Sequence, residues 1–494
     1  MYMTTKTTIR TAERHILPLL CILCLIFPGH SIVRAQDFTI TDAMQWKAYD
    51  DFNEALLDKS RNIYKSDTDQ KAADHRGNGA RDNDRSGCAA AVWCQAIYYD
   101  MVINAYNRAK KEGNEELMTK YSELHKKIHR GEKAHYVNFN FNDANTNNGW
   151  FVYDDIMWWT CALARAYEAF GSAEYLIYAE RSFCRVWYGS AVVGDDGSYA
   201  DPARFSGKDG GGMFWEWQPI AKANPHQAGD FRSACINFPT VIAACLLHQL
   251  VPEGRAVPTA ARPTSQTKEW YLEKAIEIYD WASKTLVPSA GRVADGIHGG
   301  GPEYSDHLYN QATYIGASCL LYKLTGDEQY KNNAISGTRY VFTRMVNAKR
   351  ILKYEGGYEQ GIYAAIFAQY LPMVVYDLGQ TNYLTYVQAN MQTAWDNRDP
   401  VRGIQMGNFT VATARTDVVE SYGASGMPAL MLMFPAHETA DAIQSLNDSQ
   451  GGHGGGFQPA FLNIHSALDL AGRSFTPPFR RGLYIIDGRK VVVK

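Results

Sequence analysis

Two neighbouring carboxylates in an aromatic stretch are the residues of this sequence best suited to catalysis. Asp154 and Asp155 lie within "WFVYDDIMWW" at residues 150–159, where five of the ten side chains are aromatic. Two like charges so close cannot both ionise easily, so one group keeps its proton while the other stays a carboxylate. A proton donor beside a nucleophile can break a bond in two displacement steps.

Two other Asp-Asp pairs provide a comparison, and their local sequence explains both without catalysis. Asp195-Asp196 precede Gly197 in a turn, and Asp50-Asp51 belong to the solvated face of an amphipathic helix. Asp154-Asp155 follow an Asn-Asn-Gly turn and open an apolar helix, whose macrodipole favours negative charge. Helix capping is therefore the alternative role of this third pair. Charge beside Trp and Tyr costs free energy unless it is compensated, which favours a functional site.

The spacing of the third pair favours cleavage of a glycosidic bond with retention of configuration. Adjacent α-carbons are about 3.8 Å apart. Splayed Asp side chains can then hold their carboxyl groups roughly 5–5.5 Å apart, as retaining enzymes require. An inverting enzyme needs roughly 6.5–9.5 Å, which demands nearly maximal splaying. Aromatic residues make up 13% of the chain, with 31 Tyr and 11 Trp, and such side chains can stack on sugar rings.

Composition bounds the remaining function classes. The chain has 494 residues, of which 46% are hydrophobic and 20% charged, as in a globular protein with a large core. A net charge of -3 gives no indication of a nucleic-acid partner or an anionic membrane surface. Beyond the first 35 residues, cysteines lie in apolar segments and no HExxH or CxxC motif occurs. We therefore expect core cysteines, a monomer, and no metal or cofactor.

Residues 1–35 have the pattern of a secretory leader. Lys6, Arg10 and Arg14 precede the apolar run "ILPLLCILCLIF", and Val33-Arg34-Ala35 offers a cleavage site. The apolar run is too short to span a bilayer as a mature helix. Leucines, rather than small residues, precede both cysteines of the leader, which argues against a lipoprotein. We expect an exported protein in the periplasm, on the cell surface or outside the cell, without a transmembrane segment.

The rest of the chain must position the acid pair, and its pattern predicts an all-α protein. From about residue 43 to 435, apolar residues recur at helical spacing. Tight turns such as "FGSAEY" alternate with long polar loops such as "FNFNDANTNNGW", and long loops of this kind are commonly functional. Helical hairpins whose loop ends build a cleft fit an (α/α)6 barrel, that is, a toroid of hairpins. An α-solenoid is the alternative architecture.

We therefore divide the chain into a signal peptide over 1–35, an (α/α)6 catalytic domain over 37–435, and a linker and tail over 436–494. The linker is rich in glycine. The final segment, "RGLYIIDGRKVVVK", alternates as a strand does and resembles the last strand of type IX sorting signals. A simple edge strand is the alternative interpretation of this tail.

Several segments, taken in order, resemble glycoside hydrolase family 76, the α-1,6-mannanases. The first two are "YDDIMWWTCALARAYEAFG", with its acidic pair before Trp and an Ala-rich helix, and the loop "GGGMFWEW". The others are "YDWASKTLVPSAGRVADGI" and "YNQATYIGASCLLYKLTGDEQY". The resemblance covers residues 43–435. It implies an (α/α)6 barrel that cleaves α-1,6-mannosidic backbones with retention, with Asp154 as nucleophile and Asp155 as general acid/base.

Two departures from the family pattern concern the substrate subsites. Tyr153 stands where Asn is also common, and residues 220–239 depart from the usual Lys-Asn-Ala-Ile-Ser-Asn run. The exact linkage that the chain would cleave is therefore open.

Further candidate residues are side chains that can stack on sugar rings or bind hydroxyl groups. The candidates for stacking are Trp158, Trp215 and Trp217, for which core packing is the alternative role. The candidates for hydroxyl binding are Asn310, Gln311, Glu216, Tyr358 and Glu359. Helix capping is the alternative role of Asn310 and Gln311, and an ion pair is the alternative role of Glu216.

The resulting hypothesis is a secreted endo-acting α-1,6-mannanase that uses double displacement. Another (α/α)6 hydrolase or lyase acting on a different polysaccharide is the enzyme alternative. A non-catalytic glycan-binding protein of the cell surface is the alternative from a different class. Such binders normally carry a lipidated cysteine and do not need a buried acid pair, and this sequence has the opposite features on both counts.

Overall fold

The computed structural model describes residues 38–69, 89–142, 150, 152–190, 195–205, 210–217, 226–356, 359–439 and 442–443, and the backbone of four strands between 467 and 493. The predicted signal peptide and most of the linker lie outside these residues. None of the helices described is both long and apolar enough to cross a membrane.

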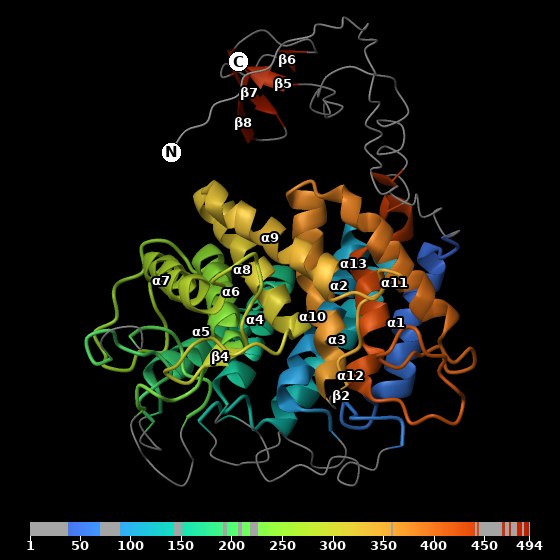
Figure 1. Cartoon of the computed structure of the whole chain (residues 1–494), viewed down its shortest axis with the longest axis horizontal. Coiled ribbons are helices and arrows are strands. Elements are labelled where there is room, and N and C mark those ends of the chain that lie inside the picture. The colour runs from blue at the N-terminus through green and yellow to red at the C-terminus, as the bar shows by residue number, and fades with distance from the viewer. Residues whose placement is uncertain are drawn as a thin grey trace, which may run out of the picture.

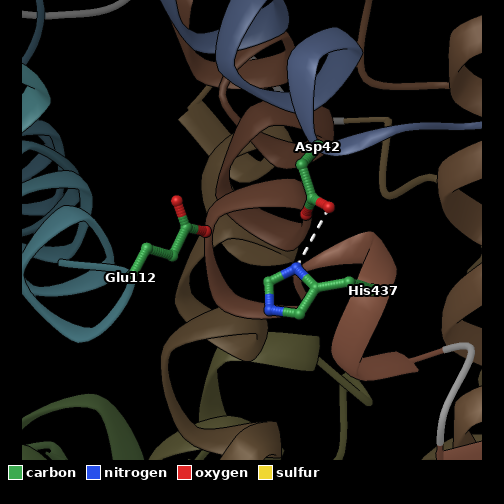
Figure 2. Close-up of side chains that lie close together, drawn as sticks. All are labelled: Asp42, Glu112 and His437. Atoms are coloured by element: carbon green, nitrogen blue, oxygen red, sulfur yellow. Dashed lines mark hydrogen bonds and ion pairs between the residues drawn. The ribbon is translucent and has the colours of Figure 1, made fainter. Parts of the chain in front are cut away.

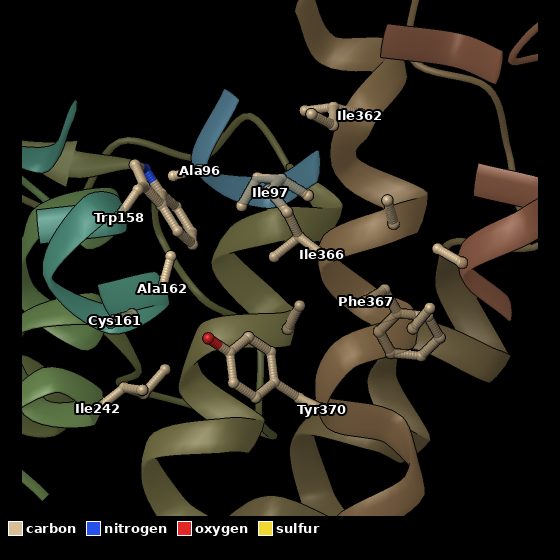
Figure 3. Close-up of a cluster of buried hydrophobic side chains, with 14 of the residues drawn as sticks. Ala96, Ile97, Trp158, Cys161, Ala162, Ile242, Ile362, Ile366, Phe367 and Tyr370 are labelled. Atoms are coloured by element: carbon tan, nitrogen blue, oxygen red, sulfur yellow. The ribbon is translucent and has the colours of Figure 1, made fainter. Parts of the chain in front are cut away.

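Six helices that are apolar on most sides lie at the centre of the molecule. In one of them, "ACINFPTVIAACLL", every residue from 234 to 247 is buried, as expected of a helix without a polar face. Figure 3 shows the packing at the centre, where Ile97, Trp158, Ile242 and Ile366 come from four different inner helices. The inner helices are α2 (Val92–Lys111), α4 (Tyr153–Phe170), α6 (Ala234–Leu250), α8 (Leu308–Thr325), α10 (Tyr363–Pro372) and α13 (Gly426–Met433).

The inner helices form a closed ring. Each packs against the next in the order α2, α4, α6, α8, α10 and α13, and α13 packs back against α2. An open solenoid would leave the first and last helices apart, so the predicted (α/α)6 barrel is confirmed and the solenoid alternative is wrong. In Figure 1 the red α13 accordingly lies beside helices from the blue start of the chain.

A second layer of amphipathic helices surrounds the ring. In α3, for example, Tyr121, His125 and Ile128 are buried on one stripe. Glu116, Lys120 and Glu123 of the same helix are exposed to solvent. Helices α3, α5, α7 and α9 each pack against the inner helix that precedes them, and α1 and α11 pack against α13. The outer helices are α1 (Asp42–Leu56), α3 (Glu115–His135), α5 (Ala173–Tyr188), α7 (Lys268–Leu286), α9 (Glu328–Arg344) and α11 (Leu384–Asp396).

The two ends of the barrel differ, as the loop lengths predict. At one end Gly171 and Gly326 adopt φ values of 72° and 73° and end α4 and α8, so the next helix starts directly. At the other end long connections carry the short pairs β1 (Leu57–Asp58) with β2 (Ile63–Tyr64), and β3 (Arg232–Ser233) with β4 (Gly296–Ile297). The remaining short elements are the 3₁₀ turns Glu359–Ile362 and Thr381–Tyr383, the π turn Met373–Asp377, and α12 (Ser421–Ala424).

Arg108 joins the two ends of the chain where the ring closes. Its buried guanidinium donates to Asp42 Oδ1 at 2.7 Å, at the start of α1, and to the carbonyl of Met431 in α13 at 2.8 Å. It also pairs with Glu112 at the end of α2, at 2.7 Å. Figure 2 shows Asp42 above the ring of His437, whose Nδ1 lies 3.0 Å from Asp42 Oδ2, and Glu112 to its left. One arginine thus connects α1, α2 and α13.

The C-terminal segment forms a small antiparallel sheet in the order β6-β5-β7-β8. Within the tail "RGLYIIDGRKVVVK", β7 (Gly482–Ile486) and β8 (Arg489–Val493) pair as a hairpin, and β8 lies at the edge. The other two strands are β5 (Ala467–Asp469) and β6 (Ser474–Phe475). The expected strand is therefore present, while its role as a sorting signal stays a prediction.

Close contact between α8 and α10 provides a test of the packing. A methyl group added at Gly316 would lie 2.3 Å from the ring of Tyr370, which is buried and held by a 3.0 Å hydrogen bond from Arg165. We expect Gly316→Ala to lower the free energy of unfolding by about 1–3 kcal/mol, measured by chemical denaturation. Gly301→Ala meets no atom within 4 Å and serves as the control. Equal stability of the two variants would contradict this packing.

Candidate active site

A pocket of about 440 Å³ opens where the inner helices begin. Most of its lining residues lie at or just before the first turns of α2, α4, α6, α8 and α10, and Trp215, Glu216 and Asp295 come from the connecting loops. The N-terminal ends of five inner helices therefore converge on one space. Helix N-termini carry partial positive charge, which favours negative groups there. The lining side chains are Trp93, Val152, Asp154, Asp155, Trp215, Glu216, Phe231, Ser233, Cys235, Asp295, Tyr309, Glu359 and Tyr363.

The acid pair lies in the first turn of α4, as its sequence context predicts. Asp154 and Asp155 are only 6% and 3% exposed, and both line the pocket. Asp154 Oδ1 and Asp155 Oδ2 have no hydrogen-bond partner among the described residues. Buried polar atoms are almost always satisfied in folded proteins, so these oxygens indicate a place where a ligand completes the site.

Short backbone pairings hold the entrance of α4 against the loop beside it. The backbone N–H of Tyr153 donates to the carbonyl of Trp215 at 2.9 Å, and Val152 forms a β-bridge with Glu216. The N–H of Trp215 in turn donates to Phe231 at 2.9 Å, directly before β3. The pairing of β3 with β4 extends this connection toward α8. The first turns of α4, α6 and α8 are thereby fixed relative to one another.

The environment raises the pKa of both acids, to different degrees. Burial raises the pKa of Asp154 to about 7, and the thiol of Cys235 with the indoles of Trp158 and Trp215 offsets part of this effect. Burial also raises the pKa of Asp155 well above its usual range, and the negative charges of Asp154 and Glu359 raise it further. Mutual repulsion was expected to separate the two groups, but burial is the larger cause. The donors around Asp154 thus favour its carboxylate form, and the negative charges beside Asp155 favour its protonated form.

Glu359 brings a further carboxylate to the pocket from the 3₁₀ turn directly before α10. Its Oε2 accepts a hydrogen bond at 2.8 Å from the indole of Trp93, which lies in the first turn of α2. This contact fixes Glu359 beside the pair, where its charge acts on Asp155. The prediction that Glu359 belongs to the site is consistent with this position.

Aromatic rings form one wall of the pocket. Tyr309 and Tyr363 stack with centroids 4.1 Å apart and an interplanar angle of 5°. Trp93 lies 6.4 Å from Tyr309 and 6.5 Å from Tyr363. Their apolar faces suit stacking against a sugar ring.

Two predicted residues at the start of α8 lie behind this surface. Asn310 is buried and donates to Asp295 Oδ1 at 2.9 Å, so it orients a pocket carboxylate but does not itself line the pocket. Gln311 accepts from the N–H of Val293 at 2.7 Å and donates to Gly291 at 2.9 Å. Because both ends of its amide bind the preceding loop, Gln311 shapes the backbone and does not face the pocket.

Of the three predicted tryptophans, one lines the pocket and two are buried away from it. Trp215 and Glu216 line the pocket. Trp158 is 2% exposed and lies in the core, with its ring near Ala96 and Ile97 in Figure 3. Trp217 is buried near the guanidinium of Arg185 and is also absent from the lining. Core packing, the alternative role for these two, is the one that the structure supports, and Tyr358 lies outside the described residues.

Several lining residues were not predicted: Trp93, Phe231, Ser233, Cys235, Asp295, Tyr309 and Tyr363. All of them except Asp295, which belongs to the loop before α8, stand at or just before the first turn of an inner helix. Sequence position at helix starts could have identified them once the barrel was assumed, and Tyr309 directly precedes the predicted Asn310-Gln311 pair.

A buried network supports the residue before the acid pair. The hydroxyl of Tyr153 donates to Asp195 Oδ1, and the guanidinium of Arg185 pairs with Asp195 Oδ2. Asp195 also accepts from the N–H of Gly197 at 2.9 Å. The contact with Gly197 agrees with the predicted turn, and the buried side chain of Asp195 has a further role, because it joins α5 to the start of α4.

Two groups of side chains within the described residues have the composition of a metal site. They are Asp42 with Glu112 and His437, and Asp195 with Asp196 and His226. Arg108 already pairs with both carboxylates of the first group. Arg185 and Arg204 pair with those of the second. These carboxylates therefore serve ion pairs.

Comparison with known proteins gives one family and several related folds. A sequence profile of glycosyl hydrolase family 76 matches residues 50–436. Among curated proteins, no sequence match is found. The α-1,6-mannanase GH76A from Salegentibacter sp. HEL1_6 is 20% identical with a TM-score of 0.60, over 79% of this chain and 98% of that one. The Lin0763 protein from Listeria innocua is also 20% identical, with a TM-score of 0.61 over 84% and 100%.

A variant of the Salegentibacter enzyme is also similar. It is described as inactive, has two adjacent aspartates changed to asparagine, and is bound to α-1,6-mannotriose. It is 19% identical with a TM-score of 0.57, over 81% of this chain and 99% of that one. At these identities the neighbours establish a shared fold.

The two neighbouring acids Asp195 and Asp196 allow the buried network to be tested with a matched control. Asp195→Ala leaves the buried Arg185 unpaired, so we expect a loss of about 3–5 kcal/mol in the free energy of unfolding. Asp196 pairs with Arg204 at the surface, with side chains 26% and 43% exposed, and Asp196→Ala should cost no more than about 1 kcal/mol. Chemical denaturation compares the two, and similar losses would contradict the supporting role of Asp195.

Proposed function

We propose that this chain, which belongs to glycosyl hydrolase family 76, is an exported endo-α-1,6-mannanase that acts with retention of configuration. Membership of the family makes the chain a glycoside hydrolase. We propose, beyond this membership, that the enzyme cleaves α-1,6-mannosidic bonds, retains the configuration and is exported. The observation that carries it is the pair of buried, adjacent aspartates in the pocket where five inner helices begin.

In the proposed mechanism the two acids take opposite protonation states. Ionised Asp154 attacks the anomeric carbon, while protonated Asp155 donates its proton to the leaving glycosidic oxygen. The resulting glycosyl ester on Asp154 is then hydrolysed by a water molecule, whose proton passes to Asp155. The surroundings support these assignments, since hydrogen-bond donors stabilise a carboxylate at Asp154, whereas the negative charges of Asp154 and Glu359 favour a protonated Asp155.

The rest of the pocket suits a neutral sugar. The faces of Tyr309 and Trp93 would stack on a ring, and Glu216 and Asp295 would accept hydrogen bonds from hydroxyl groups. Mannan is the proposed substrate because similar structures include an α-1,6-mannanase and its variant bound to α-1,6-mannotriose. That variant lost two adjacent aspartates, and this chain has such a pair at the start of α4.

A non-catalytic glycan-binding protein is the weaker alternative. Binding of a neutral sugar does not need two carboxyl groups withdrawn from water, and their burial costs free energy.

The proposed export is based on residues 1–35, which have the pattern of a secretory leader. Recovery of a secreted chain that begins after Ala35 would support it, and an intracellular chain that retains the leader would contradict it.

Replacing the acids one at a time tests the catalytic assignment. We expect Asp154→Asn and Asp155→Asn each to lower the release of reducing sugar from linear α-1,6-mannan by about 100-fold or more, because each removes one half of the acid-nucleophile pair. Proton NMR of the first products of the unaltered enzyme should show the α-anomer if configuration is retained.

The control uses a second Asp-Asp pair of the same chain. Asp50 and Asp51 lie on α1 and pair with surface lysines, so the double change Asp50→Asn/Asp51→Asn should leave hydrolysis unchanged. Undiminished hydrolysis in both pocket variants would refute the mechanism. Mannan binding without any sugar release by the unaltered protein would favour the glycan-binding alternative.

The pH profile tests the role of Glu359. A general acid must hold its proton, so kcat/KM should fall as pH rises through the pKa of Asp155. It should also fall as pH drops through the pKa of Asp154, where the nucleophile becomes protonated. Glu359→Gln removes a negative charge that raises the pKa of Asp155, so the alkaline limb should move to lower pH.

Glu216→Gln is the comparison for this profile, since Glu216 lines the same pocket but is not among the charges that raise the pKa of Asp155. We expect its alkaline limb to stay close to that of the unaltered enzyme. An alkaline limb that stays in place in Glu359→Gln, or moves to higher pH, would contradict the assignment of that limb to Asp155.

A further inference from the structure

A second pocket, of about 520 Å³, lies on the outer layer of the barrel. It is bounded by the loop after α3 at residues 138–142, by α5 and the loop that follows it, and by residues 262–264. None of its lining residues belongs to the pocket of the acid pair. Its volume is in the range of small-molecule sites.

The charges of this outer pocket are all of one sign. Arg181, Arg185 and Arg262 line it, and no carboxylate of the described residues does. Arg185 is neutralised by Asp195. Arg181 and Arg262 are exposed, and within the described part of the chain neither has an ion-pair partner. Two guanidinium groups with free donors present the planar geometry that binds phosphate or carboxylate.

The loop on the other side of the pocket has a strained backbone. Val137, Asn138 and Phe139 adopt consecutive positive φ values of 50°, 56° and 53°, a conformation that is unfavourable for residues other than glycine and especially for a β-branched one. Phe139 holds the turn in place, since its buried ring lies 5.1 Å from Trp159. Strain that the surroundings maintain in this way is concentrated at ligand sites.

The turn directs side chains that suit a sugar toward the pocket. Asn138, Asn140 and Asn142 are exposed lining residues whose amides can both donate and accept. Tyr178, on α5, adds a half-buried aromatic ring that packs 5.3 Å from Phe139. Amides and an aromatic face recognise hydroxyl groups and sugar rings, which inorganic anions lack.

We propose that the outer pocket binds a saccharide that carries a negatively charged group, either a phosphate or a carboxylate. Arg181 and Arg262 hold the charge, and the asparagines with Tyr178 hold the sugar. The pocket thereby provides the enzyme with a second point of attachment to a charged glycan, apart from the acid pair. The proposal does not depend on the substrate of the active site.

Calorimetric titration of the full chain tests the proposal with four probes. They are mannose 6-phosphate, glucuronate, inorganic phosphate and mannose, none of which contains a glycosidic bond to cleave. We expect saturable binding of mannose 6-phosphate or glucuronate, at least about tenfold tighter than that of mannose or inorganic phosphate, because charge and ring are recognised together. The first two probes distinguish a phosphate from a carboxylate as the preferred group. Added salt should weaken this binding.

Charge-matched variants locate the binding. Arg181→Gln/Arg262→Gln should weaken binding of the charged sugar by at least about tenfold. The control Arg339→Gln/Arg344→Gln removes two exposed arginines of α9 and should leave it unchanged. Both variants should hydrolyse linear, neutral α-1,6-mannan as the unaltered enzyme does, so failure at this pocket is separable from failure of the proposed activity. If the double variant does not fold, Arg262→Gln alone, in the loop, provides the same comparison.

Three results would overturn the proposal. One is the absence of saturable binding by either charged sugar. Another is that a control probe binds as tightly as the charged sugar. Inorganic phosphate binding equally tightly would make the pocket a simple anion site, and mannose binding equally tightly would show that charge has no role. The third is unchanged binding of the charged sugar after Arg181 and Arg262 are replaced.

Discussion

The free-energy cost of keeping Asp154 and Asp155 out of water is the interaction on which the rest of the site depends. In water both groups would ionise at neutral pH, and neither could donate a proton. Burial raises the pKa of both, and the uneven surroundings of thiol, indole and carboxylate separate them. A closed ring of apolar helices supplies this dry environment. The helix N-termini that point into it compensate the charge that remains.

Closure of the ring and chemistry at the pocket are therefore linked. Five of the six inner helices contribute their first turns to the pocket and their middles to the packed centre, so a shift in packing also moves a side chain of the pocket. The backbone pairings between the loop before α4, the loop at Trp215 and β3 restrict such shifts. The ion pair of Asp195 with Arg185 adds a second restriction, behind Tyr153.

The features that follow from local pattern could be predicted from the sequence. Helical periodicity, glycine caps such as Gly171 and the position of the acid pair in a first turn all depend on neighbours along the chain, and each is confirmed. The family resemblance and the barrel are confirmed as well. The roles of Trp158, Trp217 and Gln311 depend instead on which way a helix faces after packing. The bond between Asp195 and Tyr153 could not be predicted for the same reason, because the two residues are 42 positions apart and the fold brings them together.

The position of Arg108 has a consequence for the biogenesis of the protein. It bridges α1, near the beginning of the barrel, to α13, more than three hundred residues later. A nascent chain therefore cannot complete the enclosure until its last inner helix has left the ribosome. Until then the ring stays open between α10 and α2, so the barrel that withdraws the aspartates from water is complete only when its synthesis is finished.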